Sequence, residues 1–447
     1  MKIQLSDHFS YGRLLRFVLS SVIMMIFTSV YTMIDGLFVS NFVGITQFAA
    51  LNLIFPFIQL LGCVGFMFSS GGCALVSATL GMKQPKKANE IFSMLTYVAI
   101  GTGVVIAILG IILVRPVALL MGADSTLLPS CVTYGRILLA ATPGLMLQVL
   151  FQSFLVTAEK PGLGLLVTVI AGIGNIVLDA LFIVVFRWGL AGAAAATGIS
   201  QCIAGIIPLI YFCRQNGGPL RLGKAKPDLR ALGHICTNGL SELVTNISMA
   251  VVSILYNFQL MRIAGENGVA AYGAVMYISF AFSAVFIGYS IGAAPVIGYH
   301  YGAENQKELK GLFQKSQVII VLASMVLAAV AFVFAKPMAK LFVSNEPALW
   351  DMTVTAFRFY ALAVLFAGFS IFGSAFFTAL NNGLVSAAIS FSRTILFQIS
   401  LVLILPLFLE LNGVWLSLGA SEVLATVVTL IFYRSQRHKY HYWPKIL

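Results

Sequence analysis

The chain has 447 residues, of which 60% are hydrophobic and only 9% are Asp, Glu, Lys or Arg. Soluble domains carry about 25% charged residues, so this composition excludes an ordinary soluble protein and predicts an integral membrane protein in contact with lipid. The net charge of +12 is also common in proteins that bind nucleic acid. Here the basic residues lie between apolar runs, which is a membrane orientation signal and argues against nucleic acid as a partner.

Twelve apolar runs are long enough to cross a bilayer as helices, which need about 20 apolar residues. Runs of this length are too long for the strands of a membrane barrel. The first run continues past residue 35, too long for a cleaved signal peptide, so we expect it to be the first span. The predicted spans are 14–40, 49–80, 91–113, 131–157, 163–186, 189–213, 234–262, 269–299, 314–341, 352–379, 384–409 and 413–433.

The loops predict the orientation of these spans. Lys and Arg are concentrated on one side, in the N-terminus, the 83–87 loop, the 214–230 segment, the loop after His300 and the C-terminal tail. Loops rich in Lys and Arg stay in the cytoplasm. We therefore predict a multi-pass protein of the bacterial cytoplasmic (inner) membrane with both termini in the cytoplasm.

The chain divides into two similar halves. A basic segment with glycine and proline, 214–230, lies at the midpoint and is typical of a linker. The halves match at a shift of 221 residues, as Ala49–Ala50 does with Ala270–Ala271. We predict an all-α membrane protein of about 12 transmembrane helices, in two six-helix bundles related by a pseudo-twofold axis along the membrane normal. The expected divisions are an N-terminal bundle (1–213), a cytoplasmic linker (214–232), a C-terminal bundle (233–434) and a cytoplasmic tail (435–447).

Polar residues inside the spans point to a site. Asn175 and Asp179 are four residues apart in an apolar run, so they share one helix face. A carboxylate inside a bilayer costs roughly 2.5–3.5 kcal/mol on insertion scales unless it meets water, a cation or a proton. One explanation is a buried acid that neighbouring helices satisfy. A cation or proton site is the functional explanation, and we favour it.

Further polar residues are expected at a similar depth. Asp35, Asp179 and Thr197 each lie about eight residues from the outer end of a span, or about 12 Å. Asn175 and Tyr31 are one turn deeper. Together they would form an oxygen-rich cage for Na⁺, with Asp35, Asn175, Asp179 and Thr197 as ligands, or for a shared proton. Equal depth alone does not establish that these helices touch.

The second half lacks the acid pair, because the repeat partners of Asp35 and Asp179 are Tyr256 and Ser400. Arg393 and Glu422 lie in the eleventh and twelfth spans and could neutralise each other. Glu242 suits either a helix N-terminus or attraction of a cationic substrate. Methionine suits both adaptable pockets and ordinary packing. The residues that we consider for a substrate cavity are Met33, Met67, Met146, Glu242, Asn257 and Met276.

The sequence does not favour an enzyme. Residues 288–292 match the GxSxG pattern, but that pattern works on a strand-to-helix turn and here it lies in a predicted membrane helix. The histidines have no metal-ligand spacing and no phosphate-binding loop is present. We expect no cofactor other than the H⁺ or Na⁺ that the oxygen-rich cage would bind.

The pattern of 35–39 (DGLFV), Asn175-x-x-x-Asp179 and Thr197, on two six-helix halves, resembles the MATE family of multidrug and toxic-compound extrusion transporters. It is most similar to the bacterial drug-efflux branch with an acid pair in the first half. The resemblance implies a V-shaped twelve-helix fold and export of organic cations driven by an inward Na⁺ or H⁺ gradient. It also implies a cation site at Tyr31, Asp35, Asn175, Asp179 and Thr197. Members that bind the cation in the second half have an acid in the tenth span, and 353–378 has none.

We therefore predict a monomeric antiporter that exports organic cations and drugs by alternating access, with small molecules and membrane lipid as its partners. The alternative is a flippase for lipid-linked precursors. Such proteins usually have fourteen spans and a more cationic cavity, whereas this chain offers only Arg393 as a clear mid-span cation. The sequence identifies neither the substrate nor the coupling ion.

Overall fold

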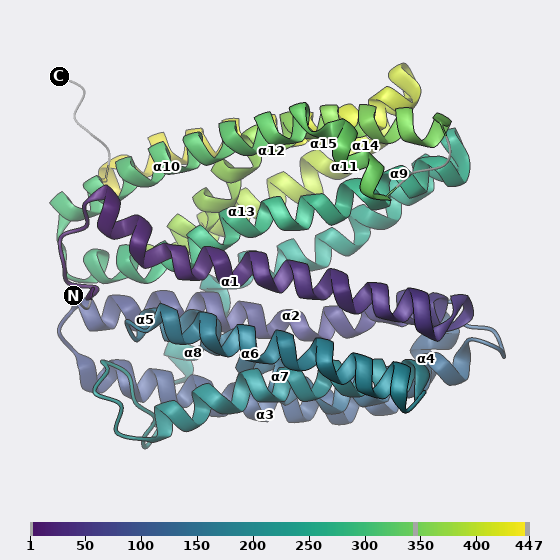
Figure 1. Ribbon diagram of the computed structural model, residues 1–447. Helices are drawn as coiled ribbons and strands as arrows, with labels where there is room; N and C mark the ends of the chain where they lie inside the picture. The colour runs from purple at the N-terminus through teal and green to yellow at the C-terminus, as the bar shows by residue number, and fades with distance from the viewer. Residues whose placement is uncertain (1–2, 343–346, 443–447) are drawn as a thin grey trace.

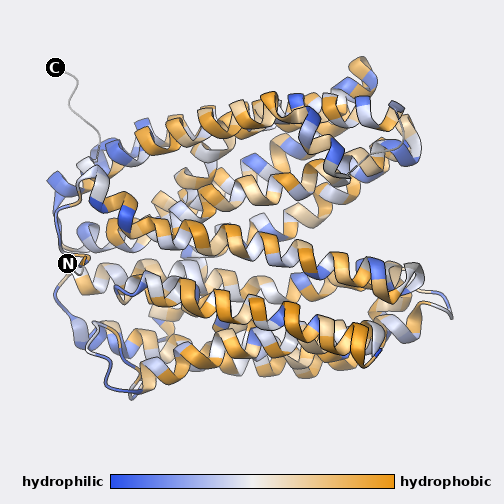
Figure 2. Cartoon of the chain, in the orientation of Figure 1, coloured by the Kyte–Doolittle hydropathy of each residue, from blue (hydrophilic) through white to orange (hydrophobic). Residues whose placement is uncertain are grey.

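A computed structural model of the chain describes residues 3–342 and 347–442, and within these ranges it consists of helices and short connections without a strand. The helices are long and lie side by side, in two groups (Figure 1). Apolar residues cover the length of the helices, and hydrophilic residues gather toward their ends (Figure 2). This distribution is the one that a bilayer requires, since the middle of each span contacts hydrocarbon.

The first group is the N-terminal half. Two of its helices, α1 and α6, end in π-helical segments, at Val39–Val43 and Ala180–Val185. Its helices are α1 (Tyr11–Phe38), α2 (Ile45–Gly81), α3 (Pro85–Leu120), α4 (Leu128–Ala140), α5 (Thr142–Thr157), α6 (Pro161–Asp179) and α7 (Gly189–Cys213).

The second group is the C-terminal half. A π-helical segment, Ser392–Ile399, joins α13 to α14 in one continuous span. Its helices are α8 (Leu229–Asn238), α9 (Leu240–Gly302), α10 (Gln306–Val333), α11 (Ala335–Phe342), α12 (Pro347–Ala379), α13 (Gly383–Phe391), α14 (Ser400–Ile404) and α15 (Pro406–Tyr440).

The described residues contain ten helices that are long and apolar enough to cross a membrane. The α4–α5 pair, bent by 52°, makes an eleventh span. Helix α9 has 63 residues, about three bilayer thicknesses, so it must fold back on itself. It does so at Gly265, whose φ of 63° is open to glycine and strained for other residues. The prediction of twelve helical spans is confirmed.

Several boundaries differ from the predicted ones, and two of them add helix outside the predicted spans. The seventh span was expected to begin at residue 234, but a separate helix, α8, ends at Asn238 and the membrane helix starts at Leu240. The side chain of Asp228 caps α8 by accepting hydrogen bonds from the Arg230 and Ala231 amides. Helix α15 continues to Tyr440, into the segment predicted as a tail. Both extensions are amphipathic or basic, so hydropathy alone does not reveal them.

Each half has its own aromatic core. In the first half the Phe92 ring lies 4.8 Å from that of Phe154 and 4.9 Å from that of Phe212. In the second half Phe313 packs 4.9 Å from Tyr433. Large apolar side chains elsewhere point outward, as in Ile112 on α3, which is 65% exposed. These outward faces suit contact with lipid tails.

The two halves meet closely at one end. A side chain at Gly81 would collide with the backbone carbonyl of Tyr299, and one at Gly302 with that of Ala78. Both glycines lie at the ends of α2 and α9, near the start of α1. Toward the opposite ends, the helices of the two halves diverge (Figure 1). Glycine is therefore required where α2 and α9 close the predicted cytoplasmic end.

Candidate cation site

The site begins with a close crossing of α1 and α6 in the first half. A Cβ atom at Gly172 would lie 2.5 Å from Cε1 of Phe27 and 2.9 Å from Cδ1 of Tyr31. Only a glycine at this position lets α1 approach α6 so closely. Because side chains four residues apart stack along one helix face, this contact brings Asp35 of α1 toward Asp179 of α6.

The carboxyl groups of Asp35 and Asp179 lie within hydrogen-bonding reach of each other. Asp179 is fully buried, and it is the last residue of α6 before the π-helical segment. Two ionised carboxylates are both acceptors and repel each other. A hydrogen bond between them requires one proton, and a cation between them would serve the same purpose.

Several polar atoms of this pair and its neighbour are buried without a hydrogen-bond partner. They are Oδ1 of Asp35, both carboxylate oxygens of Asp179, and the side-chain oxygen and nitrogen of Asn175. An unpartnered buried polar group costs about 1–3 kcal/mol, and more if it is charged. These four oxygens are ligands of the kind that Na⁺ accepts, so the residues present fit either a sodium ion or a proton.

The other two predicted residues are placed differently. The Tyr31 hydroxyl lies beside the Gln148 amide of α5 and close to Asp35, so Tyr31 belongs to the cluster. Thr197 is half-buried on α7. Among the hydrogen bonds described for this chain, none joins Thr197 to the acids. Its role as a ligand therefore remains a prediction.

Two members of the cluster were not identified from the sequence. Gln148 lies in the fourth predicted span, and its Oε1 is buried without a partner. Tyr134 on α4 is 3% exposed and lies near enough to both Asp35 and Asp179 to interact with them electrostatically. A polar residue in an apolar span was the available signal for Gln148. Nothing in the local sequence distinguishes Tyr134 from other tyrosines.

The residues considered for a substrate cavity lie in different surroundings. Met146 is fully buried, with its sulfur packed against Gly65, inside the first half. Met276 packs against the core of the second half, whereas Asn257 is exposed on α9. Met33, Met67 and Glu242 are half-buried. A common cavity for these six side chains remains a prediction.

The second half holds an ion pair instead of an acid pair. Nη2 of Arg393 lies 2.8 Å from Oε1 of Glu422, and its Nε donates to both carboxylate oxygens at 2.9 and 3.1 Å. The Ser370 hydroxyl donates a further bond to Glu422 at 3.0 Å. The expectation that Arg393 and Glu422 neutralise each other is confirmed. Arg393 also lies near enough to Glu242 to interact with its charge.

The second-half position that corresponds to Asp35 is uncharged. Tyr256 is fully buried, and its hydroxyl lies 2.7 Å from the Ser417 hydroxyl. Its ring stacks on that of Tyr272 at 5.1 Å. The repeat positions therefore hold a charged cluster in the first half and a hydrogen-bonded tyrosine in the second.

Comparison with known proteins agrees with this architecture. Relatives include the multidrug export protein MepA of Staphylococcus saprophyticus, which is 24% identical over 425 residues, or 92% of each chain. MepA of a Staphylococcus aureus strain is 22% identical and covers 94% of this chain and 93% of the relative.

Solved structures share the fold. One is the outward-facing conformation of a multidrug resistance MATE family transporter, with a TM-score of 0.93, 22% identity and 98% of each chain covered. Another is a MOP superfamily transporter from Pyrococcus furiosus, described as having a binding pocket of reverse polarity, with a TM-score of 0.91 and 97% of each chain covered.

The MatE family model matches the chain twice, at residues 20–181 and 243–404. The two matches begin 223 residues apart, close to the shift of 221 that the sequence repeat predicts. Together they span more than half of the chain and fall in both halves. The chain is therefore no enzyme, and it belongs to the MatE family of multi-pass membrane transporters.

Proposed function

We propose that this transporter exports small organic cations, drugs among them, across the bacterial cytoplasmic membrane in exchange for H⁺ or Na⁺. Staphylococcal relatives along nearly the whole chain are named multidrug export proteins, which supports the substrate class. Both halves of the transport path lie in one chain, so a monomer suffices. Both termini would lie in the cytoplasm, as the distribution of Lys and Arg indicates.

The observation that supports coupling best is the buried acid pair. Asp35 and Asp179 lie together with unpartnered oxygens in the membrane-spanning part of the first half. Such a pair is costly unless it binds a proton or a cation, and it changes charge when that ion leaves. A buried group that must gain and lose positive charge is what an ion-coupled transporter needs.

Coupling would follow from differential affinity. The closed end, where α2 meets α9, would open as the two halves rock, and the opposite end would close. A coupling ion held by Asp35, Asp179 and Asn175 would favour one of these arrangements, and an organic cation the other. By thermodynamic linkage, the coupling ion would then weaken the binding of the organic cation, and the organic cation would weaken the binding of the coupling ion.

The alternative, a flippase for lipid-linked precursors, calls for free positive charge in the transport path. The mid-span cation Arg393 is held by Glu422 through three contacts of 2.8–3.1 Å. A neutralised arginine is a poor site for an anionic headgroup. We therefore favour the export of cations.

The test is ethidium efflux from everted vesicles of a host without other pumps, with a pH gradient and a Na⁺ gradient imposed separately. We expect one gradient to drive efflux in the wild type. Asp35→Asn and Asp179→Asn should each abolish it at normal expression. Asp351→Asn, the same change at an exposed carboxylate, serves as the matched control and should leave efflux intact.

Efflux that persists in both site variants would contradict the coupling mechanism. A well-expressed wild type with no efflux under either gradient would contradict drug export. A preserved gradient response in Asp351→Asn would show that loss in the site variants is specific.

A further inference from the structure

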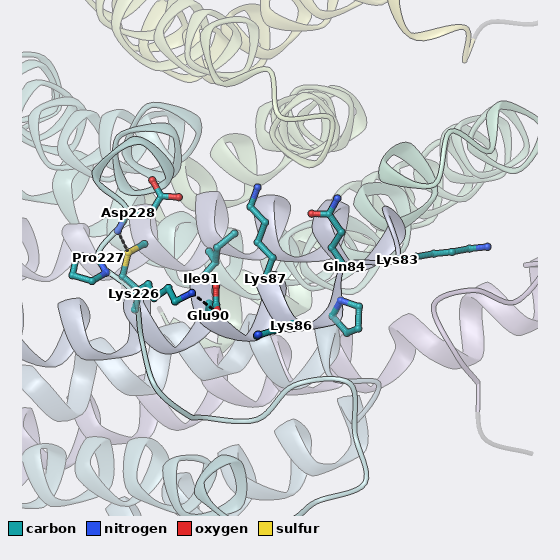
Figure 3. A pocket seen from close by; sticks show the side chains of 11 residues that line it. Lys83, Gln84, Lys86, Lys87, Glu90, Ile91, Lys226, Pro227 and Asp228 are labelled. Atoms are coloured by element: carbon teal, nitrogen blue, oxygen red, sulfur yellow. Dashed lines mark hydrogen bonds and ion pairs between the residues drawn. The ribbon is translucent and has the colours of Figure 1, made fainter.

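A basic pocket lies at the predicted cytoplasmic end of the first half, far along α3 from the acid pair. Its volume is about 690 Å³, and it lies between the first turns of α3 and residues 226–228 of the linker (Figure 3). Lys86, Lys87 and Lys226 are on its rim, and Ile91 and Met94 lie deeper. Lys83 also lines the pocket but projects away from the others in Figure 3, so we assign it no role.

The linker is fixed against α3, so the pocket has a defined shape. The Gly223 amide donates to the Ser93 hydroxyl at 3.0 Å, and the Tyr97 hydroxyl donates to the Gly223 carbonyl at 3.0 Å. Further along, the Asp228 amide donates to the Met94 sulfur at 3.2 Å. These bonds hold one wall of the pocket to the other.

The positive charge of the pocket is only partly neutralised. Nζ of Lys226 lies 3.7 Å from Oε1 of Glu90, so this lysine is paired. The Asp228 carboxylate is engaged with the first amides of α8. Lys86 and Lys87 are exposed, and the salt bridges described for this chain include neither of them. The pocket therefore offers two free ammonium groups to an anion.

The pocket also leads onto a lipid-facing surface. Four residues continue from Met94 along the same face of α3, at spacings of three, eight, three and four residues: Tyr97, Val105, Ile108 and Ile112. All four are exposed, the last two at 56% and 65%. An apolar stripe that begins at a basic pocket matches an amphiphile with an anionic head and long acyl chains.

We propose that this pocket binds the phosphate headgroup of an anionic phospholipid, whose acyl chains lie along the exposed stripe of α3. The chemistry that Lys86 and Lys87 recognise is a phosphate oxygen. A free phosphate would bind the lysines in the same way, but it has no acyl chains to contact the apolar stripe of α3. The cytoplasmic leaflet carries anionic lipid, and basic pockets at its surface attract it.

The experiment uses the full-length protein purified in a neutral detergent, with lipid binding measured by native mass spectrometry and by the shift in melting temperature. The added probes are phosphatidylglycerol, phosphatidylcholine, glycerol 1-phosphate and inorganic phosphate. The test variant is Lys86→Gln/Lys87→Gln. The matched control is Lys307→Gln/Lys310→Gln, which removes the same charge from the start of α10, where Lys307 is the repeat partner of Lys86.

We expect phosphatidylglycerol to bind more tightly than phosphatidylcholine in the wild type and in the control. In the test variant its affinity should fall about 10-fold or more, since two lysines are lost. Lys226→Gln provides a second test if the double variant does not fold, and it should also weaken phosphatidylglycerol binding.

Equal binding of the two lipids, or equal losses in the test variant and the control, would overturn the proposal. Stabilisation by glycerol 1-phosphate or inorganic phosphate as strong as that by phosphatidylglycerol would overturn the lipid assignment and indicate an anion site. Efflux is not the readout, so the proposal stands or fails independently of the transport function.

Discussion

Nδ1 of His8 lies 2.6 Å from Oε2 of Glu308, which joins the segment before α1 to the first turn of α10. The other oxygen of Glu308 accepts a hydrogen bond from the Phe9 amide at 2.9 Å. Near the start of the same segment, the Leu5 amide donates to Glu159 in the first half, also at 2.9 Å. Residues 5–9 are thus hydrogen-bonded to both halves at the end where these pack closely.

We call residues 5–9 the strap, and we expect it to favour closure of the predicted cytoplasmic end. Replacing Glu308 by Gln weakens charge-assisted bonds that are typically each worth about 1.5–3 kcal/mol. We expect Glu308→Gln to open that end more often. The measure is the alkylation rate of Ser77→Cys, in a chain without its native cysteines, because Ser77 is fully buried against Gly298 of the second half.

Glu304→Gln is the matched control for the strap, since Glu304 is exposed four residues earlier. Alkylation should be several-fold faster in Glu308→Gln than in Glu304→Gln. Equal rates in the two variants would show that the strap does not influence closure.

The crossing of α1 and α6 gives a second prediction. A methyl group at Gly172 would lie 2.5 Å from the Phe27 ring, so Gly172→Ala should push α1 away from α6 and separate Asp35 from Asp179. Overpacking of this kind costs about 1–3 kcal/mol. Gly174→Ala is the control, because nothing lies within 4 Å of its Cβ position. Ethidium efflux should fall in Gly172→Ala and persist in Gly174→Ala, and similar efflux in both would contradict this geometry.

The loop before α4 gives a prediction about pH. The pKa of Asp124 is lowered from its ordinary value of 3.8, chiefly because its carboxylate accepts a hydrogen bond from the Thr126 hydroxyl, and also one from the Leu127 amide. A lowered pKa means that these bonds contribute fully above that ordinary value and are lost as the pH falls through the lower one. The start of α4 should therefore loosen in acid.

Hydrogen exchange of residues 121–130 measures this loosening. Exchange in the wild type should rise relative to Asp124→Asn as the pH falls below about 4, because an amide side chain does not titrate. Parallel exchange profiles for the two chains at all pH values would contradict the assignment.

The sequence predicted the twelve spans because the thickness of a bilayer sets how many consecutive apolar residues a span needs. That number can be counted along the chain without knowing any contact between helices. It also placed Asn175 and Asp179 on one helix face, since the helical period fixes that relation. It indicated that Asp35 lies at a similar depth, which was necessary for the acid pair but not sufficient. The crossing at Gly172 is what brings the acids together, and that depends on the partner helix.

Contacts between different helices also explain which features of the site could not be predicted from the sequence. No described hydrogen bond joins Thr197 to the acids, and depth within a span does not fix how α7 is rotated about its axis. Tyr134 and Gln148 belong to the cluster through contacts between helices far apart in the chain. The sequence placed a break between residues 262 and 269, but it did not show that helical geometry continues up to Gly265 and resumes directly after it.

The last prediction concerns the ion pair of Arg393 and Glu422, whose side chains are 20% and 10% exposed. Removing one partner leaves the other charge uncompensated inside the protein, which typically costs about 3–5 kcal/mol. Arg393→Met and Glu422→Gln should therefore each lower the melting temperature of the purified protein. Arg434→Met, at an exposed site, should not.

The double variant Arg393→Met/Glu422→Met should melt above either single variant, because apolar side chains replace both charges together. Additive losses would mean that each residue stabilises the fold through other contacts. Recovery in the double variant would show that Arg393 serves as the fixed counter-ion of Glu422. Glu422 would then need no external cation, which leaves Asp35 and Asp179 as the acid pair that a coupling ion can neutralise.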